Sequence, residues 1–177
     1  MKKRLSAVVC IMLILILTAC SANLEELDKA ETYPASPGAL ETIYTSMDQL
    51  AQDADVIAEV TVLSQEVVPL DALPQTHSLI RIDKLLKGDP IKDNVLTVIE
   101  EGCDTKDQTV ILGVPPMKQG ETYILHLQES EGKHYILGAF QGKFIIKKDY
   151  VFQQSTEDVK MQTYFPLTKE EFLKIYS

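Results

Sequence analysis

Cysteine, positive charge and long apolar stretches are all scarce in this chain of 177 residues. Its 17 basic residues are outnumbered by 26 acidic ones, and the net charge is −9. An acidic surface repels nucleic acids and anionic lipid headgroups, so we expect neither as a partner. The apolar run at residues 7–19 has 13 residues, whereas a membrane-spanning helix needs about 20. It is therefore too short to cross a bilayer comfortably.

Residues 1–20 have the pattern of a targeting segment. Three basic residues open it, the apolar run follows, and the sequence Leu-Thr-Ala leads directly into Cys20. This arrangement resembles a bacterial lipoprotein signal, in which the cysteine thiol receives a diacylglycerol and the chain is cut just before it. We therefore predict a signal peptide at residues 1–19 and lipidation, including palmitate, at Cys20. A plain secretory signal and an uncleaved membrane anchor are the alternatives.

Cleavage before Cys20 would change both the charge and the cysteine count. It would remove three basic residues and no acidic one, which leaves a net charge of −12. Cys10 would be discarded and Cys20 acylated, so that Cys103 would be the one free thiol. An intrachain disulfide, or a zinc site built on a cysteine pair, would then be excluded.

The rest of the chain divides into a tether and one domain. Residues 20–45 are polar and acidic, and the run Pro-Ala-Ser-Pro-Gly at residues 34–38 cannot hold a helix or a central strand. As a flexible coil, this tether would span roughly 25–30 Å. Residues 46–177 form the predicted domain. Hydrophobic residues make up 45% of the whole chain, which is enough to build a core.

Two short helices and a series of strands are predicted within that domain. Ser46 with Gln49, and Thr168 with Glu171, have the spacing of capping boxes, so one helix should end near residue 54 and another should close the chain. Strands are expected at residues 56–63, 78–86, 95–99, 110–114, 122–127, 134–137 and 143–146. In the first of them, alternation predicts one buried face, with Val60 inward and Thr61 outward. The fold class is therefore mainly β, a barrel or a sandwich with short flanking α-helices, and a closed barrel is favoured because it leaves no unpaired edge.

The order of four segments carries a family resemblance. They are residues 53–62, residues 82–88, the pair Gly102-Cys103, and residues 119–125. Together they resemble the netrin-like modules and tissue inhibitors of metalloproteinases, which are OB-type barrels. They also resemble a broad set of secreted and lipid-anchored bacterial proteins. The resemblance implies that the mainly β fold is a small OB-like barrel with short flanking α-helices, covering roughly residues 47–146, but it does not imply the activity. The inhibitors chelate the protease metal through a free amino-terminal cysteine, whereas Cys20 would be acylated and Cys103 has no partner.

Three groups of residues are candidates for a metal or catalytic site. His126 and His134 flank a turn and could lie side by side across a hairpin, but they supply only two ligands, and His77 adds little. An acidic cluster around Gly102 could bind calcium, but its spacing favours a solvated loop; its members are Glu100, Glu101, Asp104 and Asp107. Cys103 has no nearby histidine in the sequence, which favours a buried or inert thiol. No metal, cofactor or catalytic residue is therefore predicted.

These patterns favour a non-enzymatic binding or adaptor module, lipid-anchored at the extracytoplasmic face of a bacterial cell membrane. Its partners would be the membrane, through the anchor, and an envelope protein or polymer. The alternative is an envelope hydrolase or metal-dependent enzyme with scattered site residues. The tertiary structure can separate these two functions. Charged and aromatic side chains that converge in one deep pocket would favour the enzyme, whereas side chains spread over a shallow face would favour the binding module.

Overall fold

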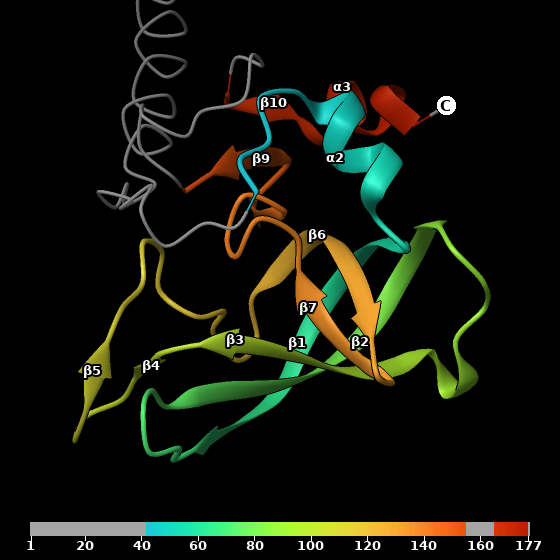
Figure 1. Ribbon diagram of the computed structural model, residues 1–177. Helices are drawn as coiled ribbons and strands as arrows, with labels where there is room; N and C mark the ends of the chain where they lie inside the picture. Colours follow the sequence, from blue (N-terminus) through green and yellow to red (C-terminus); the bar gives the residue numbers. More distant parts are fainter. Residues whose placement is uncertain (1–41, 155–164, 177) are drawn as a thin grey trace, which may run out of the picture. The chain divides into compact units, whose positions relative to one another are not determined.

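The computed structural model describes residues 42–154 and 165–176, and this part of the chain is mainly β (Figure 1). The strands are β1 (Val56–Val68), β2 (Gln75–Lys87), β3 (Val95–Glu101), β4 (Cys103–Asp104), β5 (Thr109–Val110), β6 (Thr122–Ser130), β7 (Lys133–Ile136), β8 (Lys143–Lys147), β9 (Tyr150–Gln153) and β10 (Leu167–Thr168). The α-helices are α2 (Met47–Asp53) and α3 (Lys169–Leu173), and the 3-10 turns are η2 (Lys92–Asn94) and η4 (Lys174–Tyr176).

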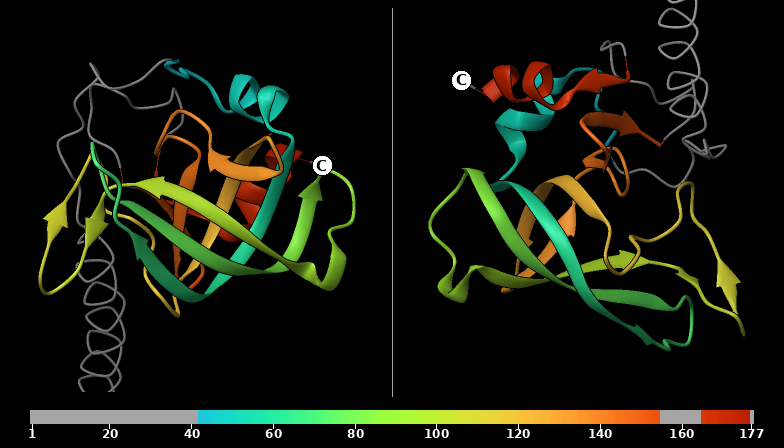
Figure 2. Two further views of the ribbon diagram at one scale, coloured as in Figure 1. Left: turned by 60° about the horizontal axis from the view of Figure 1, so that its bottom comes forward. Right: turned by 180° about the vertical axis from the view of Figure 1, so that it is seen from behind.

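Five strands close into a barrel. They follow the order β1-β2-β3-β7-β6, and β6 pairs back with β1. Every contact around the ring is antiparallel except that between β3 and β7, which is parallel. Beyond β6 the same sheet continues through β8, β9 and β10, as the two further views show (Figure 2). The predicted fold class is confirmed, and the barrel is compatible with an OB-like fold.

Both predicted helices form where their capping residues lie. In α3, the Thr168 hydroxyl accepts from the Glu171 N–H, and the Glu171 carboxylate accepts from the Thr168 N–H, which completes the capping box. In α2, Ser46 accepts from the Gln49 N–H at 3.3 Å, but the Gln49 side chain bonds Thr45 instead. The first box is therefore only half formed.

Strand β1 has the predicted inward side but is buried on both faces at its start. Val60 is 0% exposed, and Thr61 is only half-buried, as the alternation predicts. Ile57, expected on the open face, is 1% exposed because helices cover that side of the strand. The single buried face predicted for this segment is thus wrong near Ile57.

Other strand predictions differ at the edges of the barrel. The candidate at residues 110–114 reduces to β5, which pairs only with β4 in a separate hairpin. Pro115 and Pro116 follow it and cannot donate to a ladder. Strands β9 and β10 were not predicted, and they extend the sheet from β8.

The sheet separates two apolar cores. The barrel interior holds one side of β1 and β6, where Val60 lies opposite Tyr123. The other side is packed under α2 and α3 in what we call the outer cluster. Its buried members are Tyr44, Met47, Leu50, Ala54, Ile57, Ile124, Leu137, Phe144, Val151 and Phe172.

The start of the described chain packs against the domain. Tyr44, which lies within the predicted tether, is 6% exposed and belongs to the outer cluster. Cys20 and residues 20–41 lie outside the described residues. Within the described ranges, no helix has the length and hydrophobicity needed to cross a membrane.

Candidate binding pocket between strands β3 and β7

A pocket opens where the parallel pairing of β3 and β7 stops. This ladder contains two pairs, Val98 with His134 and Ile99 with Tyr135. Strand β3 continues to Glu101 while β7 ends at Ile136. The gap between them is a pocket of about 410 Å³. This volume lies within the usual range of small-molecule sites, about 300–1,000 Å³.

A tight turn after β7 carries the chain away from β3. Gly138 and Ala139 both have positive φ angles, 59° and 57°. A Cβ at Gly138 would lie 2.8 Å from the side-chain oxygen of Gln141, so the close approach requires glycine. Gln141 in turn accepts from the Tyr44 N–H at 2.9 Å and donates to its carbonyl at 2.7 Å. The turn and residue 44 therefore fix one side of the pocket.

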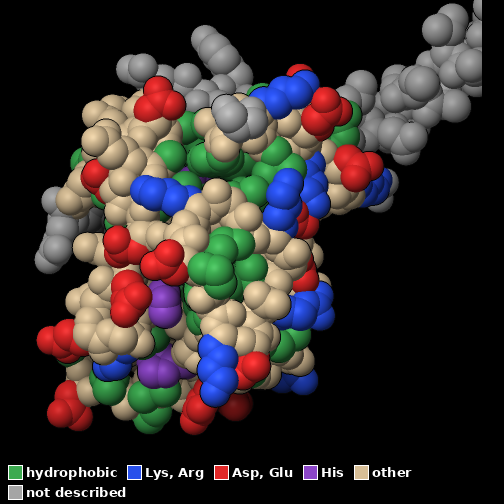
Figure 3. All heavy atoms as spheres, turned by 90° about the vertical axis from the view of Figure 1, so that its right-hand side faces the viewer, with side chains coloured by type: hydrophobic (Ala, Val, Ile, Leu, Met, Phe, Trp, Pro, Cys, Tyr) green, Lys and Arg blue, Asp and Glu red, His purple; other side chains and the backbone are tan. Residues whose placement is uncertain are grey.

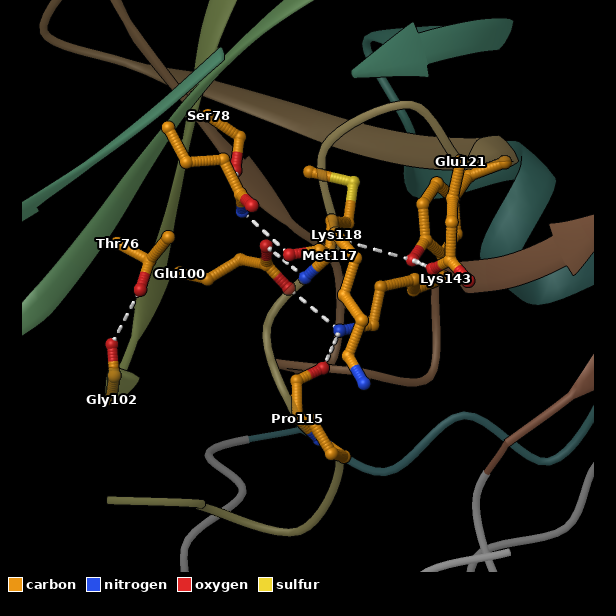
Figure 4. Close-up of polar contacts among 11 residues, drawn as sticks. Thr76, Ser78, Glu100, Gly102, Pro115, Met117, Lys118, Glu121 and Lys143 are labelled. Carbon is orange, nitrogen blue, oxygen red and sulfur yellow. Dashed lines mark hydrogen bonds and ion pairs between the residues drawn. The ribbon is translucent and has the colours of Figure 1, made fainter. Parts of the chain in front are cut away.

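Two residues of the lining form a buried ion pair, which we call the floor of the pocket; Figure 4 shows its contacts. Lys143 extends from the start of β8, and its ammonium lies 2.6 Å from Glu100 Oε1 on β3. It also donates to the Pro115 carbonyl at 2.6 Å, and Glu100 Oε2 accepts from the Met117 N–H at 2.9 Å. Lys143 is 1% exposed and Glu100 is 7% exposed. Each charge is thus neutralised by the other and oriented by a backbone group.

Further hydrogen bonds support the loop that carries Met117. Gln65 donates both to the Ser78 hydroxyl at 3.0 Å and to the Met117 carbonyl at 2.5 Å. Tyr123 accepts from the Lys118 N–H at 3.1 Å and donates to Glu121. Burial, followed by the hydrogen bond to Glu121, raises the pKa of Tyr123, so its phenol stays protonated. This network holds residues 115–118 against the end of the barrel.

The walls of the pocket combine apolar and aromatic side chains with polar ones. The apolar and aromatic residues of the lining include Ile99, Val114, Tyr135 and Phe140. The rim includes Thr42, Glu101, Leu112, Gln128 and Ala139. The lining therefore offers a ligand both apolar contact and polar groups that can form hydrogen bonds.

The predicted acidic cluster separates in the structure. Glu101, Asp104 and Asp107 are exposed, as a solvated loop predicts. Glu100 is not solvated, because it faces inward from β3 and pairs with Lys143. For Glu100 the prediction is wrong, and Lys143 was missed. The alternation of Val98 and Glu100 on one strand was the available signal, whereas nothing near Lys143 in the sequence marks its partner.

The three histidines do not converge. Glu129, rather than His126, lies opposite His134 in the hairpin, so the favourable register for a pair is absent. His126 is fully buried, and its Nε2 lies 2.7 Å from the Tyr176 hydroxyl. Burial lowers the pKa of His126 to about 3. His77 contacts Gln75 at 3.3 Å.

A second, acidic hollow lies on another face. It has a volume of about 610 Å³ and is lined by Asp55, Asp89, Glu129, Glu131 and His134, among others. Figure 3 shows acidic and histidine side chains gathered on this side of the molecule. Asp55 accepts from the Glu129 N–H at 2.8 Å. No group of three or more metal-ligating side chains occurs among the residues that the structure describes.

Cys103 is buried at the start of the β4–β5 hairpin, as expected of an inert thiol. It is 0% exposed, and its sulfur lies 3.6 Å from the Gln108 carbonyl. The neighbouring Gly102 has a φ of 93°, and a Cβ there would lie 2.3 Å from the Val110 carbonyl oxygen. This close approach explains the glycine beside the cysteine in structural terms.

Comparison with known proteins adds no family to this description. No protein-family model matches the chain. No curated protein matches it in sequence. The resemblance to netrin-like modules is therefore supported at the level of the five-stranded barrel alone.

Proposed function

We propose that this protein is a non-enzymatic binding module, anchored by lipid on Cys20 at the extracytoplasmic face of a bacterial cell membrane. It binds an envelope protein or polymer through the pocket between β3 and β7. The observation that carries this proposal is the floor of the pocket, where Lys143 and Glu100 are 2.6 Å apart. A relationship to netrin-like barrels is part of the proposal, supported by the barrel and by the order of segments.

The bonding of the ion pair favours recognition over catalysis. A general base must accept a proton from its substrate within hydrogen-bond reach. The Glu100 carboxylate already accepts from an ammonium and from a backbone N–H. It is therefore a poor base but a well-oriented acceptor, and Lys143 is a well-oriented donor. Rigid polar groups of this kind fix the orientation of a bound ligand.

The anchor is tested by metabolic labelling with a fatty-acid probe. The wild type should be labelled, and Cys20→Ser should lose the label, because the thiol is the acylated group. Cys10→Ser is the matched control and should keep the label. Equal labelling of the wild type and Cys20→Ser contradicts the anchor but leaves the pocket unaffected.

The pocket is tested by site-specific photocrosslinking in cells that express the full chain. A benzophenone amino acid at Leu112, on the rim, should give one discrete adduct with an envelope component. The same amino acid at Ile111 is the control, because this exposed neighbour is not part of the lining. Adducts of equal yield at both positions, or at neither, would contradict binding through this pocket.

A further inference from the structure

We propose that the pocket binds an extended peptide segment, which continues the sheet along the open edge of β3 and inserts a tyrosine side chain against the ion pair. This inference depends on the binding function proposed above and specifies its ligand. It is carried by the geometry of the β3 edge, by the unused hydrogen-bonding capacity of Lys143, and by the charge of the lining.

Among the described residues, no strand pairs with the pocket side of β3 after Ile99, so this edge is open there. On its other side β3 stays paired with β2 as far as Glu101, which lies opposite Gln75. The Gly102 N–H bonds the Pro74 carbonyl on that same side at 2.7 Å. Successive residues direct their backbone groups to opposite edges of a strand, so the N–H and C=O of Glu101 point toward the pocket. Extended peptides add to open edges of this kind through main-chain hydrogen bonds.

The ion pair can take one more hydrogen bond. An ammonium has three N–H donors, and two of those of Lys143 are used, by Glu100 and by the Pro115 carbonyl. Among the described residues no third acceptor contacts Lys143. A tyrosine hydroxyl can accept from the third N–H and donate to the Glu100 carboxylate. Its ring would contact apolar side chains of the lining such as Val114 and Phe140.

The charge of the lining favours basic residues beside that tyrosine. The lining contains two carboxylates, Glu100 and Glu101, and one ammonium, Lys143. Since Lys143 neutralises Glu100, the exposed Glu101 leaves one negative charge at the rim. A lysine near the tyrosine would be attracted to Glu101, and this contribution would weaken as salt is added.

The probe is a blocked pentapeptide with a central tyrosine between two valines and a lysine at each end. It is titrated into the full chain in detergent micelles, and binding is followed by amide chemical shifts. We expect saturable binding with the largest shifts at residues 99–101 and 135–139. Replacing the tyrosine with phenylalanine should weaken binding by at least about tenfold, since the hydroxyl's two hydrogen bonds to charged groups, Lys143 and Glu100, are both lost.

Backbone pairing is tested by N-methylation of the probe. Because successive amides of a strand face opposite edges, only one of two adjacent amides can bond Glu101. N-methylation at the tyrosine or at the next valine should therefore weaken binding about tenfold at one position and much less at the other. Equal effects at both positions would overturn strand addition.

Two pairs of variants locate the site. Leu112→Trp should fill the pocket and abolish binding, whereas Ile111→Trp, beside it but outside the lining, should not. Glu101→Lys should weaken binding about fivefold, whereas Asp89→Lys, with the same change of charge beyond β2, should have little effect. If neither Leu112→Trp nor Glu101→Lys weakens binding more than its control, the proposed location of the site is overturned.

The result also separates this inference from the proposed function. If Leu112 gives a photoadduct but the pentapeptide does not bind, the proposal of a peptide ligand is overturned, and the pocket binds another ligand. An oligomer of N-acetylglucosamine, titrated in parallel, would then identify a polymer by the same shifts. If no photoadduct forms at Leu112 and the pentapeptide does not bind either, both proposals are overturned.

Discussion

The two sides of the sheet bury side chains of different chemistry. On the barrel side, the end next to the pocket holds a lysine and a glutamate, which are satisfied by each other and by the backbone. On the other side, the outer cluster is aromatic, with Phe144 and Phe172 at a ring distance of 5.1 Å. His126 lies beside these rings, and its Nδ1 has no hydrogen-bond partner.

This difference shows how each region can fail. A buried ion pair costs free energy to desolvate, so its stability depends on keeping both partners. An apolar cluster has no such requirement, but a neutral imidazole within it must stay neutral. The barrel end should therefore be sensitive to the loss of one charge, and the outer cluster to acid.

The largest expected effect comes from placing a charge on either side of β1. Val60→Asp and Ile57→Asp each bury an unpaired carboxylate, one in the barrel and one in the outer cluster, and should each cost more than about 4 kcal/mol. Ser64→Asp, at an exposed position of the same strand, is the control. Urea unfolding measures all three. A mild effect of Ile57→Asp would show that the outer face of β1 is open, as the sequence pattern predicts.

Next in size is the loss of one partner of the ion pair. Lys143→Met leaves Glu100 buried without its counter-charge and should cost about 3–5 kcal/mol of unfolding free energy. The double variant with Glu100→Leu should be closer to the wild type, because no charge remains. Lys169→Met, which breaks the more exposed pair with Glu59, should cost at most about 1 kcal/mol. Equal losses of unfolding free energy in Lys143→Met and Lys169→Met would contradict the difference expected between the buried and the more exposed ion pair.

Acid should weaken the outer cluster through His126. Its folded pKa is about 3, below the usual value near 6.5, so the unfolded chain binds a proton first as the pH falls. The stability is complete above pH 6.5 and should decrease by about 1 kcal/mol per pH unit between pH 6 and pH 4. His126→Phe should remove this slope. Urea unfolding of the wild type and of His126→Phe at several pH values measures this slope. Parallel curves of unfolding free energy against pH would contradict the role of His126.

The smallest effect should come from the helix caps over the outer cluster. Thr168→Ala removes a complete capping box and should cost about 1 kcal/mol. Ser46→Ala removes only the single bond to the Gln49 N–H and should cost less. Thermal unfolding would compare the two variants. A larger effect at Ser46 would mean that α2, rather than α3, is the more important cover.

Much of the fold could be predicted because local patterns coincide with tertiary burial. Thr168 and Glu171 specify a cap within four residues, and α3 begins there. The alternation around Val60 needs no partner strand to be recognised. Strand β9 was missed because Val151 and Phe152 make a short apolar pair beside charged turns, and only their neighbours in the sheet give them a role.

The candidate site was much less predictable. Glu100 resembled the exposed acidic residues that follow it, because a sequence gives the charge of a side chain but not its environment. Its partner Lys143 is separated from it by 43 positions. His126 and His134 flank one turn, which allows a pair in the sequence, but the register places Glu129 opposite His134.

The sequence by itself determined the acidic composition, the mainly β class, the two capped helices and the inward side of β1. Each of these depends on residues within a few positions of one another, where backbone geometry and solvent preference act directly. Only the tertiary structure decided that β3 and β7 separate after two pairs, that Lys143 reaches Glu100, and that Ile57 is covered. Those outcomes depend on which distant segments share the space beside a strand, and this is a property of the closed barrel as a whole.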